Sequence, residues 1–281
     1  MQRAALAANR SLDVLSFLAA NPSQGHTLTE LARGLGVNPS SMHGILAVMT
    51  ESGFLLRHSS HKTYRLGPMA AAVGQAAYEQ NPSIDLTRQE LVRLSEQFDL
   101  QAAVVASIED AMIVVGRHGP ATGEFLTFVG QRVTHAPPFG SIFAAWAPTD
   151  RAAQWLRAAD PALDDAQADA YERVLDDVRL EGRAILVVQN REFRFASARV
   201  STADPSGLLV PLETGGSYRL FYVGVPIFNS EGEVSLGLFV DGPPNKLGVD
   251  KIEEIAERLE VAARAVITRT GGRALNGASP R

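Results

Sequence analysis

Apolar residues before Gly53 recur at helical spacing and predict three consecutive amphipathic helices. The turn-forming run 21–23 ends the first helix, whose apolar positions are Leu12, Val14, Leu15, Phe17 and Leu18. The second helix runs through Leu31, Ala32 and Leu35. The third presents a face formed by Met42, Ile45, Leu46 and Met49. Two short strands, 54–57 and 63–66, are then predicted on either side of a polar tip at 58–62.

Capping residues mark the starts of the second and third helices. Thr27 and Glu30 have the spacing of a capping box, in which each residue satisfies a backbone N–H at the other. Asn38 is a suitable N-cap for the third helix, and Pro39 suits the first helical position because its missing N–H would be unpaired there anyway. Three helices and a hairpin predict a winged helix-turn-helix, whose later central helix can enter a DNA major groove. The alternative is a three-helix unit that serves dimerisation or docking.

The remainder of the chain predicts a second domain, of the α+β class. Residues 68–98 are expected to be helical with a break at 81–83, which makes a linker helix and then the first helix of that domain. From Gln101 the period changes to that of strands, and a hairpin is expected to turn at Glu109-Asp110. The predicted strands are 102–108, 111–118, 124–129, 183–189, 193–200, 218–227 and 234–240, and the predicted helices are 140–146, 164–180 and about 250–267.

These elements predict four segments. We expect a winged helix-turn-helix at 1–67, a linker helix at 68–82, a mixed domain with a largely antiparallel sheet at 83–270 and a disordered tail at 271–281. The two folded parts suit a chain of 281 residues with 46% hydrophobic content, which can bury a sizeable core.

Composition and charge narrow the class of protein. The chain has no Cys, which excludes disulfides, thiolate zinc sites and Cys nucleophiles. No apolar run indicates a signal peptide or a membrane span, so we expect a soluble, cytoplasmic protein with no membrane partner. The formal charge is −5, yet residues 1–80 hold six Lys or Arg against four Asp or Glu. This asymmetry favours a weakly basic N-terminal part on an acidic remainder, although random scatter is the alternative.

Enzyme signatures are missing from the sequence. It contains no nucleophile elbow, no phosphate-binding P-loop, no H-E-x-x-H and no G-x-G-x-x-G after a strand. His135, Ser141 and Asp241 could be imagined as a hydrolytic set, but nothing in their spacing requires it. His58 and His61 lie on a predicted turn without a carboxylate nearby, which gives little support for a metal site. We therefore predict that the protein is not an enzyme and needs no cofactor.

Motifs in both halves resemble those of the IclR family of bacterial transcriptional regulators. In the first half they are residues 10–15 (RSLDVL), 28–32 (LTELA) and 64–67 (YRLG); in the second they are His135-Ala136 with Gly140, and residues 222–228 (YVGVPIF). The resemblance implies a winged-helix domain on an operator in double-stranded DNA, a linker helix and a GAF-like domain for a small-molecule effector. It also implies homodimers formed through the N-terminal part, and often tetramers, that repress or activate transcription.

The third helix departs from the family pattern in charge. Family members commonly carry a Lys and an Arg where this chain has Pro39 and Gly44. The remaining candidates for DNA contact on the second and third helices are Thr29, Ser40, Ser41 and His43. Cations in and beside the predicted wing could replace the missing charge; with His58 and His61 they are Arg57, Lys62 and Arg65. The alternative is a divergent regulator that has lost specific DNA binding and acts through mixed dimers or another protein.

The resemblance also places an effector pocket in the second domain. It maps the pocket to 135–141 and 222–226, and the candidates are His135, Pro137, Phe139, Gly140, Ser141, Arg219, Tyr222 and Gly224. Tyr222 stands where a Cys is frequent, Ser141 where a Lys is common, and residues 183–185 replace an acidic stretch. Aromatic and polar groups together suit a small organic acid or an aromatic metabolite, whose carboxylate could pair with Arg219, Arg199 or His135. The alternative is that the aromatics are core residues and the arginines lie on the surface.

Overall fold

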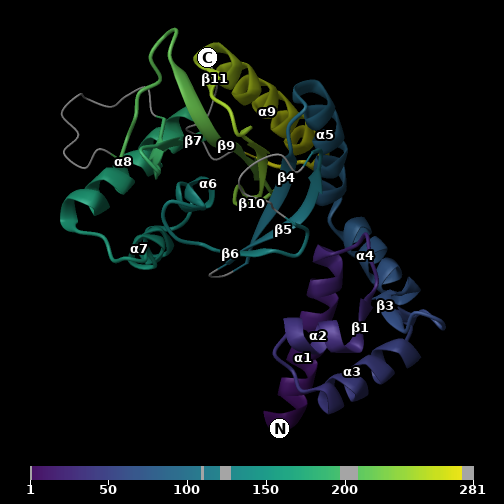
Figure 1. Ribbon diagram of the computed structural model, residues 1–281. Coiled ribbons are helices and arrows are strands. Elements are labelled where there is room, and N and C mark those ends of the chain that lie inside the picture. The colour runs from purple at the N-terminus through teal and green to yellow at the C-terminus, as the bar shows by residue number, and fades with distance from the viewer. Residues whose placement is uncertain (1, 109–110, 121–127, 197–207, 274–281) are drawn as a thin grey trace. The chain divides into compact units, whose positions relative to one another are not determined.

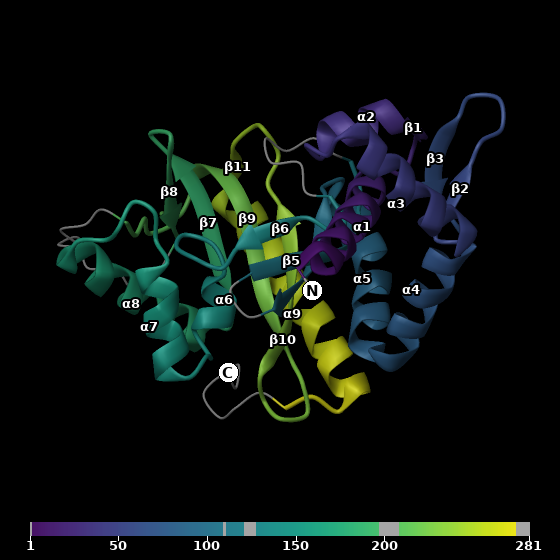
Figure 2. The same cartoon turned by 90° about the horizontal axis from the view of Figure 1, so that it is seen from below.

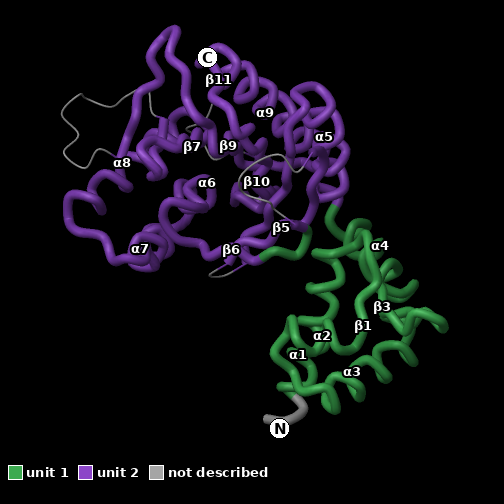
Figure 3. The backbone as a smooth tube through the Cα atoms, in the orientation of Figure 1, with its two compact units in different colours: residues 1–81, 129–131 green, residues 82–128, 132–281 purple. Residues whose placement is uncertain are grey.

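The computed structural model describes residues 2–108, 111–120, 128–196 and 208–273. The chain divides into two compact units (Figure 3). We call residues 1–81 with 129–131 the N-terminal unit, and residues 82–128 with 132–281 the C-terminal unit. None of the described helices combines the length and the apolar character needed to cross a bilayer.

The N-terminal unit is a winged helix-turn-helix followed by a further helix (Figure 1). The predicted three helices and hairpin are confirmed, and a short strand that was not predicted, β1, precedes the second helix. The strands form a sheet of order β1-β3-β2, in which both pairs are antiparallel. The elements are α1 (Gln2–Ala20), β1 (His26–Thr27), α2 (Leu28–Gly34), α3 (Pro39–Glu51), β2 (Leu55–Arg57), β3 (Thr63–Leu66) and α4 (Pro68–Gln80).

The predicted capping residues start α2 and α3. The side-chain oxygen of Thr27 accepts a hydrogen bond from the backbone N–H of Glu30 at 3.3 Å, and Glu30 Oε2 accepts from the N–H of Thr27 at 2.7 Å. Asn38 Oδ1 accepts from the N–H of Ser41 at 2.8 Å, and Pro39 occupies the first turn of α3. These bonds satisfy backbone donors that have no partner inside their helix, so both helix starts are fixed locally.

One hydrophobic core holds the three helices and the wing together. α3 contributes the inward residues Met42, Leu46 and Met49, which pack with buried residues from the other elements: Val14, Leu18, Leu31, Ala32, Val37, Leu55 and Tyr64. The 3.6-residue period of α3 places the rest of its surface outward. The core therefore decides which face of α3 is available to a partner.

The C-terminal unit is built on an antiparallel sheet of order β6-β5-β4-β10-β9-β7-β8, with β11 paired to β9. The predicted hairpin is confirmed, because β4 and β5 pair in antiparallel register on either side of the predicted turn. The strands are β4 (Ala102–Ile108), β5 (Ala111–His118), β6 (Arg132–Thr134), β7 (Ala184–Gln189), β8 (Glu192–Phe195), β9 (Ser217–Phe228), β10 (Val234–Asp241) and β11 (Leu247–Gly248).

Helices cover both faces of this sheet (Figures 1 and 2). On one face, α5 (Pro82–Phe98) and α9 (Val249–Thr270) pack over a core that includes Leu94, Val225 and Leu259. On the other, a core with Trp155, Tyr171 and Tyr222 lies under α6 (Ser141–Ala144), α7 (Thr149–Arg157) and α8 (Asp165–Glu181). The expected α+β class with a largely antiparallel sheet is confirmed.

Several elements differ from the sequence predictions. α7 and β6 were not predicted, and the helix expected at 140–146 is the short α6. The strand expected at 193–200 ends at Phe195, and residues 197–200 lie outside the described part of the chain. The strand expected at 124–129 and the turn Glu109-Asp110 also fall largely or wholly on residues that are not described. At the start of the expected tail, the N–H of Arg273 donates to the carbonyl of Asn229 at 2.9 Å; residues 274–281 are not described.

A candidate DNA interface and a candidate effector cavity

The outward face of α3 carries none of the chain's Lys or Arg residues. Ser40, His43 and Gly44 are exposed there, and Ser41 is half-buried at the edge of the same face. Thr29 is exposed in the first turn of α2. The predicted helix residues are thus accessible, and their hydroxyl and imidazole groups can exchange hydrogen bonds with phosphates or base edges.

The wing distributes its cations over two faces. Leu56 lies opposite Arg65 and Arg57 opposite Tyr64 in the β2–β3 pairing. Residues opposite each other share a face of the ribbon and consecutive residues alternate, so Arg57 and Arg65 lie on opposite faces. The Arg57 guanidinium stands 5.8 Å from the centre of the Tyr64 ring, a cation–π contact that orients it.

The wing tip gathers the remaining polar candidates. The backbone N–H of Lys62 donates to the carbonyl of His58 at 2.9 Å, and Lys62 has a φ of 52°, in the left-handed region. The rings of His58 and His61 are 4.8 Å apart, and the N–H of His61 donates to His58 Nδ1 at 3.3 Å. Across the described ranges, no group of three or more His, Cys, Asp or Glu residues has the arrangement of a metal site.

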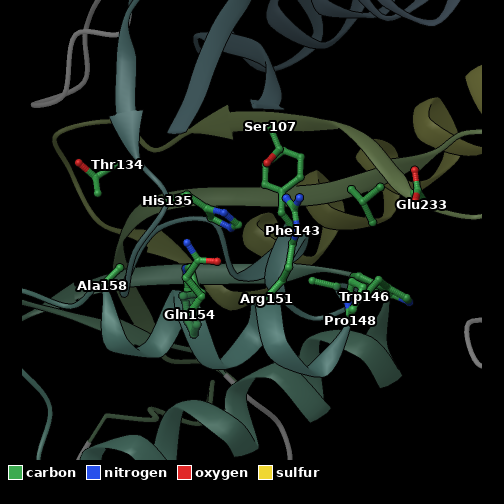
Figure 4. Close-up of a pocket in the computed structure, with 13 residues that line it drawn as sticks. Ser107, Thr134, His135, Phe143, Trp146, Pro148, Arg151, Gln154, Ala158 and Glu233 are labelled. Carbon is green, nitrogen blue, oxygen red and sulfur yellow. The ribbon is translucent and has the colours of Figure 1, made fainter. Parts of the chain in front are cut away.

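A cavity of about 580 Å³ opens in the C-terminal unit beside α6 and α7 (Figure 4). The size suits a small organic ligand. The walls mix apolar surface with a few polar groups: Ser107, Thr134, His135, Phe143, Trp146, Ala147, Pro148, Arg151, Gln154, Trp155, Ala158, Glu233 and Val234.

α7 supplies two polar side chains to the lining of this cavity. Arg151 and Gln154 are spaced i and i+3, so they share one face of the helix, and Figure 4 shows both extending from it into the cavity. Trp155 is fully buried and anchors the helix, because its Nε1–H donates to the carbonyl of Phe139 at 2.7 Å and its ring meets Tyr171 edge-on at 5.6 Å. Arg151 has no hydrogen bond or ion pair with any residue in the described part of the chain, which leaves its guanidinium available to a ligand.

His135 is held by the loop that leads into α6. Its Nε2 lies 3.2 Å from the carbonyl oxygen of Gly140, and its ring meets Phe143 edge-on at 6.0 Å. Gly140 has a φ of 83°, and a Cβ added there would approach His135 Cδ2 to 2.3 Å. Glycine is therefore required at this position for two reasons, the left-handed backbone and the close approach of the imidazole.

Other predicted effector residues lie in the aromatic core next to this cavity. Phe139 contacts Phe221 with ring centres 5.7 Å apart, and the ring of Tyr222 meets Phe239 edge-on at 5.2 Å. Gly224 leaves room for Phe239, because a Cβ there would lie 2.5 Å from that ring. These aromatic residues therefore pack in the core, which was the alternative to a role in ligand binding.

The remaining predicted residues occupy separate places. Ser141 is fully buried, and its Oγ has no hydrogen-bond partner among the described residues. Burial raises the pKa of Tyr222. Pro137 precedes a cis peptide bond to Pro138, and Arg219 lies half-buried on β9. Arg199 lies outside the described residues. Of the predicted set, His135 is the member that lines the 580 Å³ cavity.

Sequence reasoning missed Arg151 and Gln154 because it missed α7, and it assigned no role to Trp146, the last residue of the helix expected at 140–146. A signal was present: Ala152, Trp155 and Leu156 have the i, i+3, i+4 spacing of an amphipathic helix. The preceding Pro148 also suits a helix start.

Comparison with known proteins identifies the N-terminal unit. The sequence model of the IclR helix-turn-helix domain matches residues 7–59. The HTH-type transcriptional regulator BhcR of Paracoccus denitrificans is 26% identical over 270 residues, which cover 92% of this chain and 85% of that protein. That relative is named as a transcriptional regulator and not as an enzyme, in agreement with the sequence prediction.

Solved structures extend the likeness in fold to both units. An IclR transcriptional regulator from Alicyclobacillus acidocaldarius has a TM-score of 0.66 and 23% identity, with 94% of this chain and 98% of that one covered. An IclR homologue from Microbacterium hydrocarbonoxydans, solved with 4-hydroxybenzoate, has a TM-score of 0.62 and 18% identity, with 95% and 98% covered. Residues 7–59 therefore form an IclR helix-turn-helix domain, and the chain is similar over nearly its whole length to a transcriptional regulator and, in fold, to IclR-type regulators.

Proposed function

We propose that this transcriptional regulator binds its operator through residues 1–67, while a small organic acid or an aromatic carboxylate bound within residues 83–270 modulates that binding. Residues 68–82 would link the two parts, and the protein would act as a homodimer or as a tetramer of two dimers. The observation that carries the DNA half is the IclR helix-turn-helix match over residues 7–59. The outward face of α3, exposed opposite the core residues Met42, Leu46 and Met49, supports it.

The cations that anchor the DNA lie outside α3. Arg57, Lys62 and Arg65 are all exposed on the wing, and the recognition helix itself offers Ser40, Ser41 and His43. Because Arg57 and Arg65 occupy opposite faces of the ribbon, a wing inserted in the minor groove would place one cation toward each phosphate strand.

Fluorescence anisotropy tests the DNA half. The protein is titrated onto DNA from upstream of its own gene and onto a scrambled duplex, at several salt concentrations. We expect tighter binding to the upstream DNA, and we expect the Arg57→Ala, Lys62→Ala, Arg65→Ala triple variant to lose affinity and to have a shallower salt dependence. Equal, weak, salt-erased binding to both duplexes would contradict specific recognition and would favour the alternative of a regulator that acts through another protein.

The cavity beside α7 carries the effector half. Phe143, Trp146 and Trp155 provide aromatic walls, and the exposed guanidinium of Arg151 offers two parallel donors to a carboxylate. Glu233 also borders the cavity, where its carboxylate accepts a hydrogen bond from Asn229 Nδ2 at 3.3 Å. This combination suits a molecule with a carboxylate and a separate hydrogen-bond donor. The 4-hydroxybenzoate bound to the Microbacterium relative has that chemistry.

Isothermal titration calorimetry with 4-hydroxybenzoate as the probe tests the effector half. We expect binding by the wild type and a loss of at least tenfold in affinity for Arg151→Ala, because one charged hydrogen-bond partner is removed. Arg157→Ala is the matched control, since Arg157 is exposed on the same helix but does not line the cavity. Equal affinities for all three proteins would exclude Arg151 as the carboxylate partner. Bound ligand need favour one arrangement of the protein by only a few kcal/mol to control DNA binding.

A further inference from the structure

The outward face of α3 is apolar at its centre. Gly44, Ala47 and Val48 are all exposed, and they are spaced so that they share one side of the helix. Val48 is 65% exposed, more than any other large hydrophobic side chain among the described residues. A Cβ added to Gly44 would meet no atom within 4 Å, so the surface beside Val48 is open.

Polar groups in the later half of α3 are already engaged with their own backbone. Thr50 Oγ1 donates to the carbonyl of Leu46 at 2.6 Å, and Ser52 Oγ donates to the carbonyl of Val48 at 2.8 Å. The exposed charged residue of the helix is Glu51, which DNA phosphates repel. The groups able to bond base edges therefore belong to the first turns, at Ser40, Ser41 and His43.

We propose that α3 reads its operator chiefly through the 5-methyl groups of thymines, which Val48 and Ala47 contact in the major groove. This inference rests on the proposed function and names the chemistry by which its DNA site is recognised. Thymine is the standard DNA base that presents a methyl group in the major groove, and small apolar side chains recognise it by direct contact. Gly44 has no side chain to hold the helix away, so the backbone can approach the base edges closely.

The distribution of charge assigns phosphate contacts to the wing and base contacts to α3. Phosphate contacts fix the position of a protein on DNA without reading the sequence, and here the cations for those contacts lie on the wing. Beyond its first turns the outward face of the recognition helix is left with the apolar surface of Ala47 and Val48, which cannot bond the polar edges of guanine or cytosine. Operator half-sites are thus expected to carry thymines at the positions that face Val48 and Ala47.

Replacement of thymine by deoxyuridine tests the inference, because it removes only the methyl group. The highest-affinity duplex is first selected from random DNA with the full-length protein, and each thymine of its half-sites is then replaced singly. At the contacted positions we expect about fourfold weaker binding per methyl lost, which is the value of one buried carbon of this kind.

A variant cycle assigns the contact to a side chain. The Val48→Ala variant should bind the thymine duplex more weakly than the wild type does. At the position that Val48 contacts, replacement of thymine by deoxyuridine should weaken binding of the wild type but not of the variant. Val261→Ala is the matched control, because Val261 is 48% exposed on α9 of the C-terminal unit. Val48 is exposed, so its truncation leaves the core residues of the unit unchanged.

Two outcomes separate this inference from the proposed function. Sequence-specific binding that deoxyuridine leaves unchanged at every thymine overturns methyl recognition and leaves operator binding intact. Random DNA that yields no preferred duplex overturns specific operator binding, and methyl recognition with it.

Discussion

At the scale of single residues, Asp241 is a half-buried carboxylate at the end of β10 whose pKa is raised. Burial raises its pKa to about 6, and the hydrogen bond from Gln101 opposes that shift. Gln101 Nε2 donates to Asp241 Oδ2 at 2.6 Å, and Arg117 Nη1 donates to Gln101 Oε1 at 2.8 Å. Arg117 therefore fixes the amide of Gln101 in the orientation that presents its NH₂ group to the carboxylate.

The raised pKa of Asp241 predicts a stability that depends on pH. The folded protein holds this proton more tightly than the unfolded chain does. The free energy of unfolding therefore falls as pH rises from about 4, the ordinary pKa of the carboxyl, to about 6, its pKa in the folded protein. Asp241→Asn removes this cost and keeps an oxygen for Gln101. We expect the variant to gain about 3 kcal/mol over the wild type at pH 7 and little at pH 4, measured by urea unfolding.

A matched control for Asp241 is Asp169→Asn, because Asp169 is exposed on α8. Its stability difference from the wild type should not change between pH 4 and pH 7. A gain for Asp241→Asn that is the same at both pH values would contradict the assigned ionisation.

At the scale of elements, the capping box of α2 sets the start of the helix that precedes the recognition helix. The hydrogen bonds from Thr27 lower the pKa of Glu30, so this bond network stabilises the fold above the ordinary pKa of a glutamate and weakens as Glu30 is protonated. We expect Thr27→Ala to destabilise the protein by about 1 kcal/mol, measured as a lower urea midpoint for the N-terminal unit.

Thr29→Ala controls for the loss of a threonine from the same turn. Thr29 is exposed and has no capping bond, so its truncation should leave the urea midpoint nearly unchanged. Equal losses for Thr27→Ala and Thr29→Ala would mean that the capping bonds do not stabilise the helix start.

Elements could be predicted from the sequence where local chemistry determines them. Asn38 with Pro39 and Thr27 with Glu30 place two helix starts by bonds within a few residues. α7 was not predicted because it is a short helix. Its stability depends on the burial of Trp155 in a core formed by distant segments. Helices of this length draw most of their stability from tertiary packing, which leaves a weak local signal.

The candidate sites also differ in whether local sequence or tertiary packing determines them. The exposed residues of α3 could be predicted, because the period of its buried residues fixes which positions point outward. The cavity is lined by α7 together with residues as distant in sequence as Ser107 and Glu233. No local sequence pattern predicts that these segments lie side by side. Family motifs instead pointed to Phe139 and Tyr222, whose rings pack in the adjacent core.

At the scale of the whole molecule, regulation requires that the two binding events influence each other. If a ligand changes the affinity for DNA by some factor, DNA must change the affinity for that ligand by the same factor. We expect this factor to lie between about 5 and 150, the usual range for such coupling. Titration of 4-hydroxybenzoate with and without saturating operator DNA measures it, and a ligand affinity that DNA leaves unchanged would show that this compound is not a regulatory effector.

The sequence contains two tryptophans, and both Trp146 and Trp155 line the cavity beside α7. All of the chain's indole emission therefore originates at the walls of one cavity, one ring buried with its N–H bonded to the carbonyl of Phe139 and the other stacked edge-on against Phe228 at 5.3 Å. A compound that enters this space changes the polarity around both fluorophores. The unlabelled protein is consequently its own optical sensor for the occupant of this cavity.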